Sequence, residues 1–295
     1  MAQSGNKTQT STAARLGYPA DARLMILNAD DFGMCHDQNE GVIRGLTDGV
    51  FTSSTILVTC PWFEEAAEFA RAHPDADLGV HLTLNAEWDR YKWGPILGKN
   101  AVPSLSDERG YLWKDVMQVF QHDKIDEAEA ELRAQIDKAL AAGIDVTHLD
   151  SHMGPLHYHI DYHEVYVRLA RDYRLPIRLA ARSQIHEQGM DSILAQLGEF
   201  DILGPDYLEF QGTPSAEATE SYWTGLIRGL KPGITELLCH PAVAREELKS
   251  CADDYRQREA DLRFFTSDQT RRLIEDEGVI MLGYRKLRAA MHGNG

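Results

Sequence analysis

One stretch of sequence decides the fold of this chain: Leu24-Met25-Ile26-Leu27-Asn28-Ala29-Asp30-Asp31-Phe32-Gly33. Its first half is a short continuous apolar run, which is typical of a buried parallel strand. Neighbouring strand residues point to opposite faces, so Asp30 and Asp31 are expected to point in different directions. A charge at the end of a buried strand is costly unless a partner stabilises it. A divalent metal for one carboxylate and a proton-transfer role for the other would supply the partners.

A structural alternative exists for the same two aspartates. A helix is expected over residues 36–45, and acidic residues just before a helix often cap its first backbone N–H groups. The aspartate pair alone does not separate a helix cap from a functional site. The histidines described below favour the functional site.

The rest of the chain alternates strand-like and helix-like segments. Helices are expected over residues 61–72, 123–142, 156–173 and 267–275, where apolar residues recur at helical spacing or capping residues mark the ends. Strands are expected near residues 24–29, 54–59, 77–82, 145–150, 176–180, 235–239 and 278–282, with a weaker candidate at 206–210. This order predicts an α/β fold with a single distorted (β/α) barrel of seven or eight strands. The rival is a doubly wound open sheet, and the first strand is not followed by the GxGxxG motif of dinucleotide-binding folds.

Composition limits the class of partner. The chain has 295 residues and a formal net charge of −16, which argues against nucleic acid or an anionic membrane as the main partner. No run of 18 apolar residues occurs, so no transmembrane helix is expected. The four cysteines show no CxxC pairing, which fits a reduced, cytoplasmic protein. Residues 1–20 are polar and small and are expected to form a disordered tail, followed by one domain over residues 21–295. A homodimer is compatible with the sequence.

One long irregular segment interrupts the alternation. Residues 85–115 contain Trp88, Tyr91, Trp93, Tyr111 and Trp113 among glycines and prolines. Such a loop could form a lid or a wall that stacks on sugar rings. The alternative is a surface excursion packed by its own aromatic side chains.

Three histidines stand at the ends of predicted strands. These are His81, His152 and His240. Because the carboxyl ends of parallel strands meet at one face of a barrel, they are expected to meet Asp30 and Asp31 in one cleft. Two histidines and one carboxylate leave coordination positions open for water and substrate, as in a catalytic metal site. Asp30 could then accept a proton and His240 could donate one.

The segment before His152 also contains His148 and Asp150. On a strand these three residues alternate and share one face. Asp150 is expected to orient His152 through a hydrogen bond. If the segment were helical, His148 and His152 would instead form a ligand pair four residues apart.

Taken together, these motifs resemble the YdjC-like carbohydrate deacetylases, the family of chitooligosaccharide deacetylases. The resemblance runs from about residue 23 to residue 287 and rests on six pieces: Asn28-Ala29-Asp30-Asp31-Phe32-Gly33, Thr52-Ser53-Ser54-Thr55, Gly79-Val80-His81-Leu82-Thr83, Thr147-His148-Leu149-Asp150-Ser151-His152, Pro176-Ile177-Arg178 and Cys239-His240-Pro241. It implies a distorted barrel that removes acetyl groups from N-acetylated sugars with a divalent cation.

The resemblance also implies roles for individual residues. It makes Asp31, His81 and His152 the metal ligands. It makes Asp30 the general base and His240 the general acid, and Arg178 matches an arginine that could hold Asp30.

The metal and the sugar are less defined. Two histidines and one aspartate suit zinc, cobalt or manganese, whereas the family likeness adds magnesium. The segment after His152, Met153-Gly154-Pro155-Leu156-His157, differs from the His-rich run of chitooligosaccharide members, so sugar specificity does not carry over. Two other hypotheses remain: a metal-dependent amidase or phosphoesterase using the same site, and a catalytically inactive sugar-binding protein.

Overall fold

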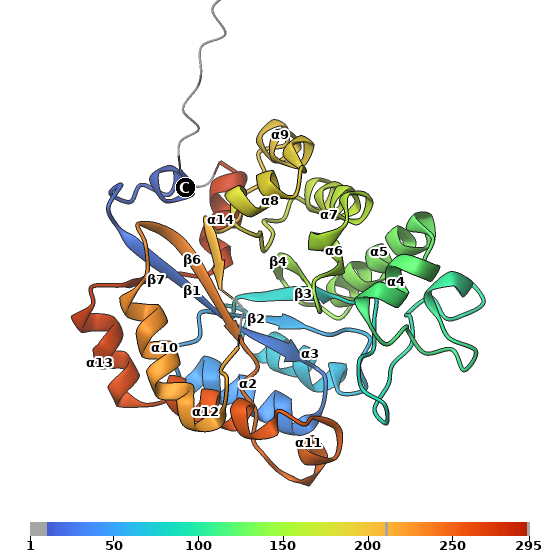
Figure 1. Cartoon of the computed structure of the whole chain (residues 1–295), viewed down its shortest axis with the longest axis horizontal. Coiled ribbons are helices and arrows are strands. Elements are labelled where there is room, and N and C mark those ends of the chain that lie inside the picture. Colours follow the sequence, from blue (N-terminus) through green and yellow to red (C-terminus); the bar gives the residue numbers. More distant parts are fainter. Residues whose placement is uncertain (1–10, 210–211, 294–295) are drawn as a thin grey trace, which may run out of the picture.

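The protein is organised around a curled parallel sheet. The computed structural model describes residues 11–209 and 212–293. The strand order is β4-β3-β2-β1-β6-β5, and β7 pairs with β1 outside this path. Helices surround the sheet (Figure 1). The strands are β1 (Arg23–Phe32), β2 (Ser53–Ile56), β3 (Leu78–Leu82), β4 (Val146–Ser151), β5 (Tyr207–Glu209), β6 (Gly233–Cys239) and β7 (Ile280–Met281).

Fourteen α-helices connect and cover these strands in the described residues. They are α1 (Thr12–Arg15), α2 (His36–Asp48), α3 (Phe63–Ala72), α4 (Val116–His122), α5 (Ile125–Ala141), α6 (Pro155–Tyr158), α7 (Ile160–Tyr173), α8 (Arg182–Glu187), α9 (Asp191–Glu199), α10 (Thr219–Arg228), α11 (Glu246–Cys251), α12 (Tyr255–Phe265), α13 (Asp268–Asp276) and α14 (Tyr284–Met291). Short 3₁₀ turns cover Pro103–Leu105 and Ala216–Ala218. The expected helices correspond to α2, α3, α5, α6 with α7, and α13.

The first strand is the centre of the molecule. It pairs with β6 on one side, and with β7 and then β2 along the other. Its alternate residues enter two different apolar clusters. Met25 and Leu27 belong to the main core, whereas Leu24 and Ile26 pack in a smaller cluster with Tyr284 of α14. Both faces of β1 are therefore buried, which explains why its sequence is continuously apolar instead of alternating.

The predicted α/β class is confirmed, and the sheet is a half-barrel. Seven of the eight expected strands form, whereas residues 176–180 make only a single bridge between Ile177 and Leu149 of β4. Pro176 has no N–H to donate to a ladder, which limits pairing here. Among the described residues the sheet therefore stays open, with β4 and β5 as its two edge strands.

A buried tyrosine connects β4 to residues 176–180, which form no strand. The Tyr166 hydroxyl of α7 lies 2.7 Å from the carbonyl oxygen of Leu149 and 3.2 Å from that of Arg178. The side chain is fully buried. Tyr166 thus links the end of β4 to the segment that carries Arg178.

Part of the N-terminal segment that was expected to be disordered is helical. Residues 1–10 lie outside the described part of the chain. Residues 12–15 form α1, whose Ala13 is buried in the smaller apolar cluster. Arg15 also pairs with Asp201 at 2.6 Å. The prediction of disorder up to residue 20 is therefore wrong for this segment, because apolar packing and an ion pair stabilise it. Within the described ranges, no helix is both long and apolar enough to cross a membrane.

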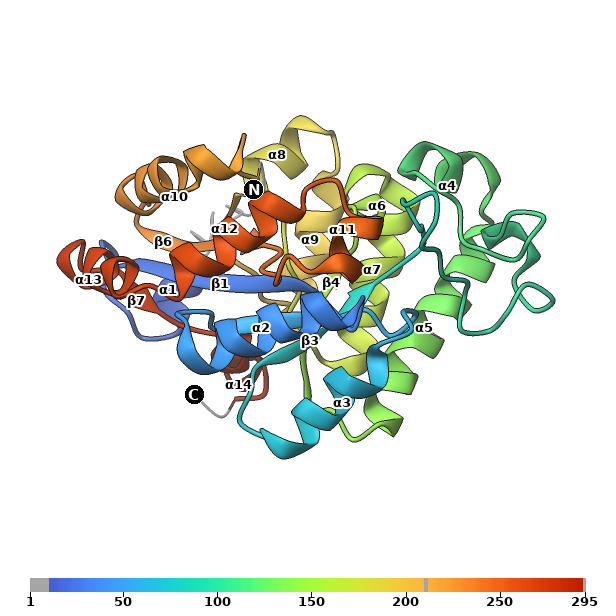
Figure 2. The same cartoon turned by 90° about the horizontal axis from the view of Figure 1, so that it is seen from below.

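The long loop lies beyond β3. Residues 85–115 extend away from the sheet together with α4, at the end toward which β1 and β3 run (Figure 2). The indole N–H of Trp93 donates to the Asn85 carbonyl, and that of Trp113 donates to the Ser104 carbonyl. Two of its tryptophans thus hold the loop together through bonds to its own backbone.

The role of Tyr166 can be tested by removing its hydroxyl. Tyr166→Phe is expected to lower the free energy of unfolding by about 1–2 kcal/mol, because a buried hydrogen-bond donor is lost. Urea denaturation measures this value. The control is Tyr173→Phe on the same helix, because the Tyr173 hydroxyl donates to the exposed carboxylate of Asp137. Equal destabilisation by both variants would contradict a bridging role for Tyr166.

Candidate metal centre

One cavity collects all six residues singled out in the sequence. It has a volume of about 800 Å³ and lies at the carboxyl ends of β1, β3, β4 and β6. Its lining includes Asp30, Asp31, His81, His152, Arg178 and His240. The expectation that these strand ends converge is therefore met in space.

The two aspartates point toward the same group, which the pleat alone would not allow. Asp31 has a left-handed backbone with φ of 68°, and the pairing of β1 with β2 shifts register between Ala29 and Phe32. As a result Asp30 Oδ2 lies 3.8 Å and Asp31 Oδ1 lies 3.5 Å from Nε2 of His81. The expectation of divergent aspartates was wrong, because the bulge reorients Asp31. Neither aspartate caps α2, since its N-cap is Cys35.

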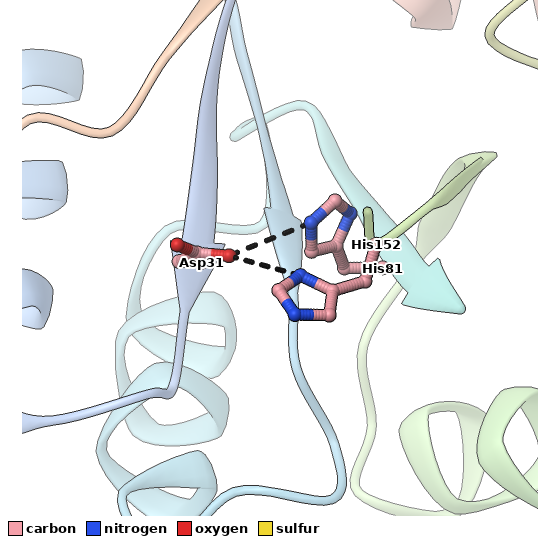
Figure 3. A group of neighbouring side chains, drawn as sticks. All are labelled: Asp31, His81 and His152. Carbon is pink, nitrogen blue, oxygen red and sulfur yellow. Dashed lines mark ion pairs between the residues drawn. The ribbon is translucent and has the colours of Figure 1, made fainter. Parts of the chain in front are cut away.

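Three atoms that could each donate an electron pair to a metal face one another; together they are called the donor group. Asp31 Oδ1 lies 3.5 Å from His81 Nε2 and 3.4 Å from His152 Nδ1 (Figure 3). Each side chain is at most 3% exposed. A tetrahedral cation with bonds near 2.0–2.1 Å would hold its ligand atoms roughly 3.3 Å apart. The spacing of the three atoms therefore fits a small divalent metal.

The carboxylate of Asp31 supports the same reading. Its Oδ1 atom is buried and has no hydrogen-bond partner among the described residues. Leaving a buried acceptor unpaired is costly. A cation held with His81 and His152 would satisfy this atom, so the donor set fits a metal.

The second nitrogen of His81 is held by a carboxylate. Asp150 Oδ1 lies 2.5 Å from His81 Nδ1. Burial disfavours the charged ring, but Asp150 outweighs it and the pKa of His81 rises to about 9. The sequence predicted that Asp150 would orient His152, and this was wrong. Asp150 is the register partner of His81 across β3 and β4, and paired residues share a face of the sheet.

The partner of His152 is a residue that sequence reasoning missed. Glu87 Oε2 lies 2.9 Å from His152 Nε2. Burial disfavours the charged form of His152, yet Glu87 and Asp31 raise its pKa to about 10. Glu87 stands six residues after His81 in an irregular segment, and no spacing rule pointed to it.

Asp30 is gripped by Arg178. The guanidinium donates to both carboxylate oxygens, over 2.8 Å from Nη1 and 2.7 Å from Nη2. Asn28 donates a third bond of 2.7 Å. Burial opposes ionisation, but Arg178 outweighs it and holds the pKa of Asp30 well below its ordinary value. Asp30 is therefore an ionised carboxylate beside the donor group.

Two further side chains approach the other oxygen of Asp31. His240 Nε2 lies 3.8 Å from Oδ2, and its side chain is 35% exposed. Burial lowers the pKa of His240 although Asp31 opposes this shift. Arg258 of α12, which the sequence did not reveal, donates to Oδ2 over 3.0 Å.

Other candidates fall outside the group. His148 is fully buried and stacks on Tyr284 with ring centroids 3.8 Å apart. Trp93 is only 3% exposed and packs against the ring of His152 at 5.9 Å. The idea that Trp93 stacks on sugar is therefore wrong, whereas Trp88 does line the cavity.

Curated relatives match nearly the whole chain. A carbohydrate deacetylase of Enterococcus faecalis is 33% identical over 269 residues, covering 90% of this chain and 98% of the relative. A carbohydrate deacetylase of Thermoanaerobacter pseudethanolicus is 26% identical over 275 residues, covering 90% of this chain and 100% of the relative.

A solved structure shows the same fold. It is a protein from Enterococcus faecalis described as a proposed cellobiose-phosphate cleavage protein, with a TM-score of 0.76 and 31% identity. The match covers 90% of this chain and 99% of that one. In addition, the model of the family described as YdjC-like protein matches residues 24–276. This chain belongs to the YdjC-like protein family.

Proposed function

We propose that this protein is a metal-dependent carbohydrate deacetylase, a hydrolase that removes the acetyl group from an N-acetylated amino sugar or oligosaccharide. The observation that carries the proposal is Oδ1 of Asp31, which has no hydrogen bond among the described residues and faces two histidine nitrogens beside Asp30, itself held by Arg178. The name of the two relatives supplies the substrate class. One divalent cation is the implied cofactor, with Asp31, His81 and His152 as its ligands.

The proposed reaction assigns a separate task to each group. A cation bound by these ligands would polarise the acetamide carbonyl and activate a water molecule. Asp30 accepts the proton of the attacking water, because Arg178 keeps it ionised and fixed in place. His240 donates a proton to the departing amine from its protonated form; burial lowers the pKa of this ring, which makes that form a stronger acid but a less populated one at neutral pH. Acetate and the free amino sugar leave together.

The shape of the cavity favours a sugar. Three apolar side chains line it and expose their faces: half-buried Trp88, Met153 at 53% exposure and Tyr158 at 51%. Aromatic faces stack well on the apolar side of pyranose rings. Tyr158, which is exposed in the cavity, therefore takes the stacking role that the sequence analysis considered for the aromatic residues of the loop, Trp93 included.

The charges in the cavity argue against a phosphate ester. The arginines among its lining residues are Arg178 and Arg258, and no lysine of the described residues lines the cavity. Both are nearly buried and bound to carboxylates, Arg178 to Asp30 and Arg258 to Asp31. A phosphate would meet few free donors here, so a phosphoesterase is the weaker hypothesis. A sugar-binding protein would have no need for so many buried carboxylates.

The metal requirement gives the direct test of the function. Acetate release from N-acetylglucosamine oligomers is expected to stop with a chelator and to return with added Zn²⁺, Mn²⁺ or Mg²⁺. His81→Ala and His152→Ala are expected to lose stoichiometric metal, measured by elemental analysis, because each removes one of three ligands. The control is His186→Ala, at an exposed position of α8. Full metal content in both ligand variants would refute the ligand set, and chelator-resistant acetate release would refute the mechanism.

The two neighbouring aspartates are expected to differ in effect. Asp30→Asn should retain the metal but lose about 100-fold or more in kcat, the usual scale for a lost general base. Asp31→Asn should lose metal affinity first, with part of the activity returning at high metal concentration. Metal titration and steady-state kinetics on both variants measure this. Loss of metal in Asp30→Asn with retention in Asp31→Asn would exchange the two roles.

The aromatic wall is tested with substrates of different length. Trp88→Ala combined with Tyr158→Ala should raise KM for oligomers by about 2- to 10-fold, which corresponds to the loss of stacking. KM for a single acetylated sugar should change less. Tyr111→Ala on the same loop is the control, since Tyr111 does not line the cavity. An equal change of KM for both substrates would mean that the two side chains only support the cavity.

A further inference from the structure

Glu87 lies where the long loop meets the donor group. Its Oε2 is 2.9 Å from Nε2 of His152, and its side chain is only 18% exposed. The backbone on its N-terminal side is anchored twice. The N–H of Ala86 donates to the carbonyl of Trp113, and the carbonyl of Asn85 accepts from the indole of Trp93. The carboxylate is thus carried by a fixed stretch of loop.

The contact decides which nitrogen of His152 faces Asp31. A neutral imidazole carries one proton, and a carboxylate on one nitrogen places that proton there. A histidine binds a metal as the neutral ring, and with Glu87 accepting from Nε2–H that ring would turn the lone pair of Nδ1 toward Asp31 Oδ1, 3.4 Å away. The ring is also packed by Trp93, at 5.9 Å between centroids. Glu87 and Trp93 together fix the tautomer and the orientation of His152.

His81 is arranged in the opposite sense. Asp150 holds its Nδ1 atom, and Nε2 faces Asp31. Each of the two histidines therefore has one nitrogen bound to a carboxylate and the other directed at the same oxygen. Asp150 comes from a strand of the sheet, whereas Glu87 comes from the loop that also lines the cavity.

We infer that Glu87 is a positioning residue for the metal, so that residues 85–115 are part of the metal centre as well as part of the cavity wall. The inference rests on the proposed function, because it takes His152 as a ligand. Glu87 acts through His152 and adds negative charge near the cation, and both effects strengthen metal binding.

The test is a metal titration of the full chain, prepared metal-free, with Zn²⁺ and separately with Mn²⁺. Glu87→Gln is expected to raise the metal dissociation constant by about 10- to 100-fold, the usual range for losing such a partner. Glu87→Asp keeps the charge but has a shorter side chain, and it should lose less affinity. Metal-free Glu87→Gln should melt somewhat below the parent, because the contact with the buried His152 is lost, but it should keep a cooperative transition, which shows that the fold survives.

A matched control separates positioning from the total charge of the cavity. Glu187 of α8 is an exposed carboxylate that lines the same cavity. Among the described residues it makes no hydrogen bond or ion pair with His152. Glu187→Gln removes the same charge and should leave the metal dissociation constant nearly unchanged. Equal weakening in Glu87→Gln and Glu187→Gln, or no weakening in Glu87→Gln, would overturn the inference. Failure of the parent itself to bind metal would instead overturn the proposed function.

Discussion

The interaction on which the structure depends is the burial of one arginine among three carboxylates. Arg178 is 3% exposed and pairs with Asp30, with Asp150 at 2.8 Å and with Glu236 at 2.9 Å. These carboxylates come from β1, β4 and β6. Without the guanidinium, three buried like charges would repel one another, and removing one partner of such a network is strongly destabilising. The segment around Arg178 is therefore fixed by charge where it does not form a strand.

This network contacts two different regions of the half-barrel. On one side lies the small apolar cluster of Leu24, Ile26 and Tyr284. The Tyr284 hydroxyl donates to Glu236, and burial raises the pKa of that carboxyl to about 7 although Arg178 opposes the shift. On the other side, Asp30 and Asp150 connect Arg178 to His81 of the donor group. Asp150 accepts from Thr55 at 2.8 Å and holds His81.

The proposed chemistry follows from this order. Adjacent aspartates on one strand have different partners: Asp30 has an arginine on both oxygens, whereas Asp31 has Arg258 on one oxygen and none on the other. The first arrangement favours a fixed, ionised proton acceptor. The second leaves one buried oxygen to bind a cation. The distinct roles of two identical side chains thus arise from their contacts, since their intrinsic pKa values are the same.

The sequence by itself determined the strands and what stands at their ends. A continuously apolar run predicts a strand buried on both faces, and parallel strands bring their carboxyl ends together. These two rules were enough to bring Asp30, Asp31, His81, His152 and His240 to one cavity. They hold because burial and chain direction are properties of each segment alone.

Tertiary structure decided how those residues are oriented and what completes them. The bulge at Asp31 depends on the pairing of β1 with β2, and the bond from Asp150 to His81 depends on the register of β3 with β4. Glu87 and Arg258 reach the site from a loop and from a distant helix. Local pattern carries no information on such contacts, because they are fixed by how separate segments pack against one another.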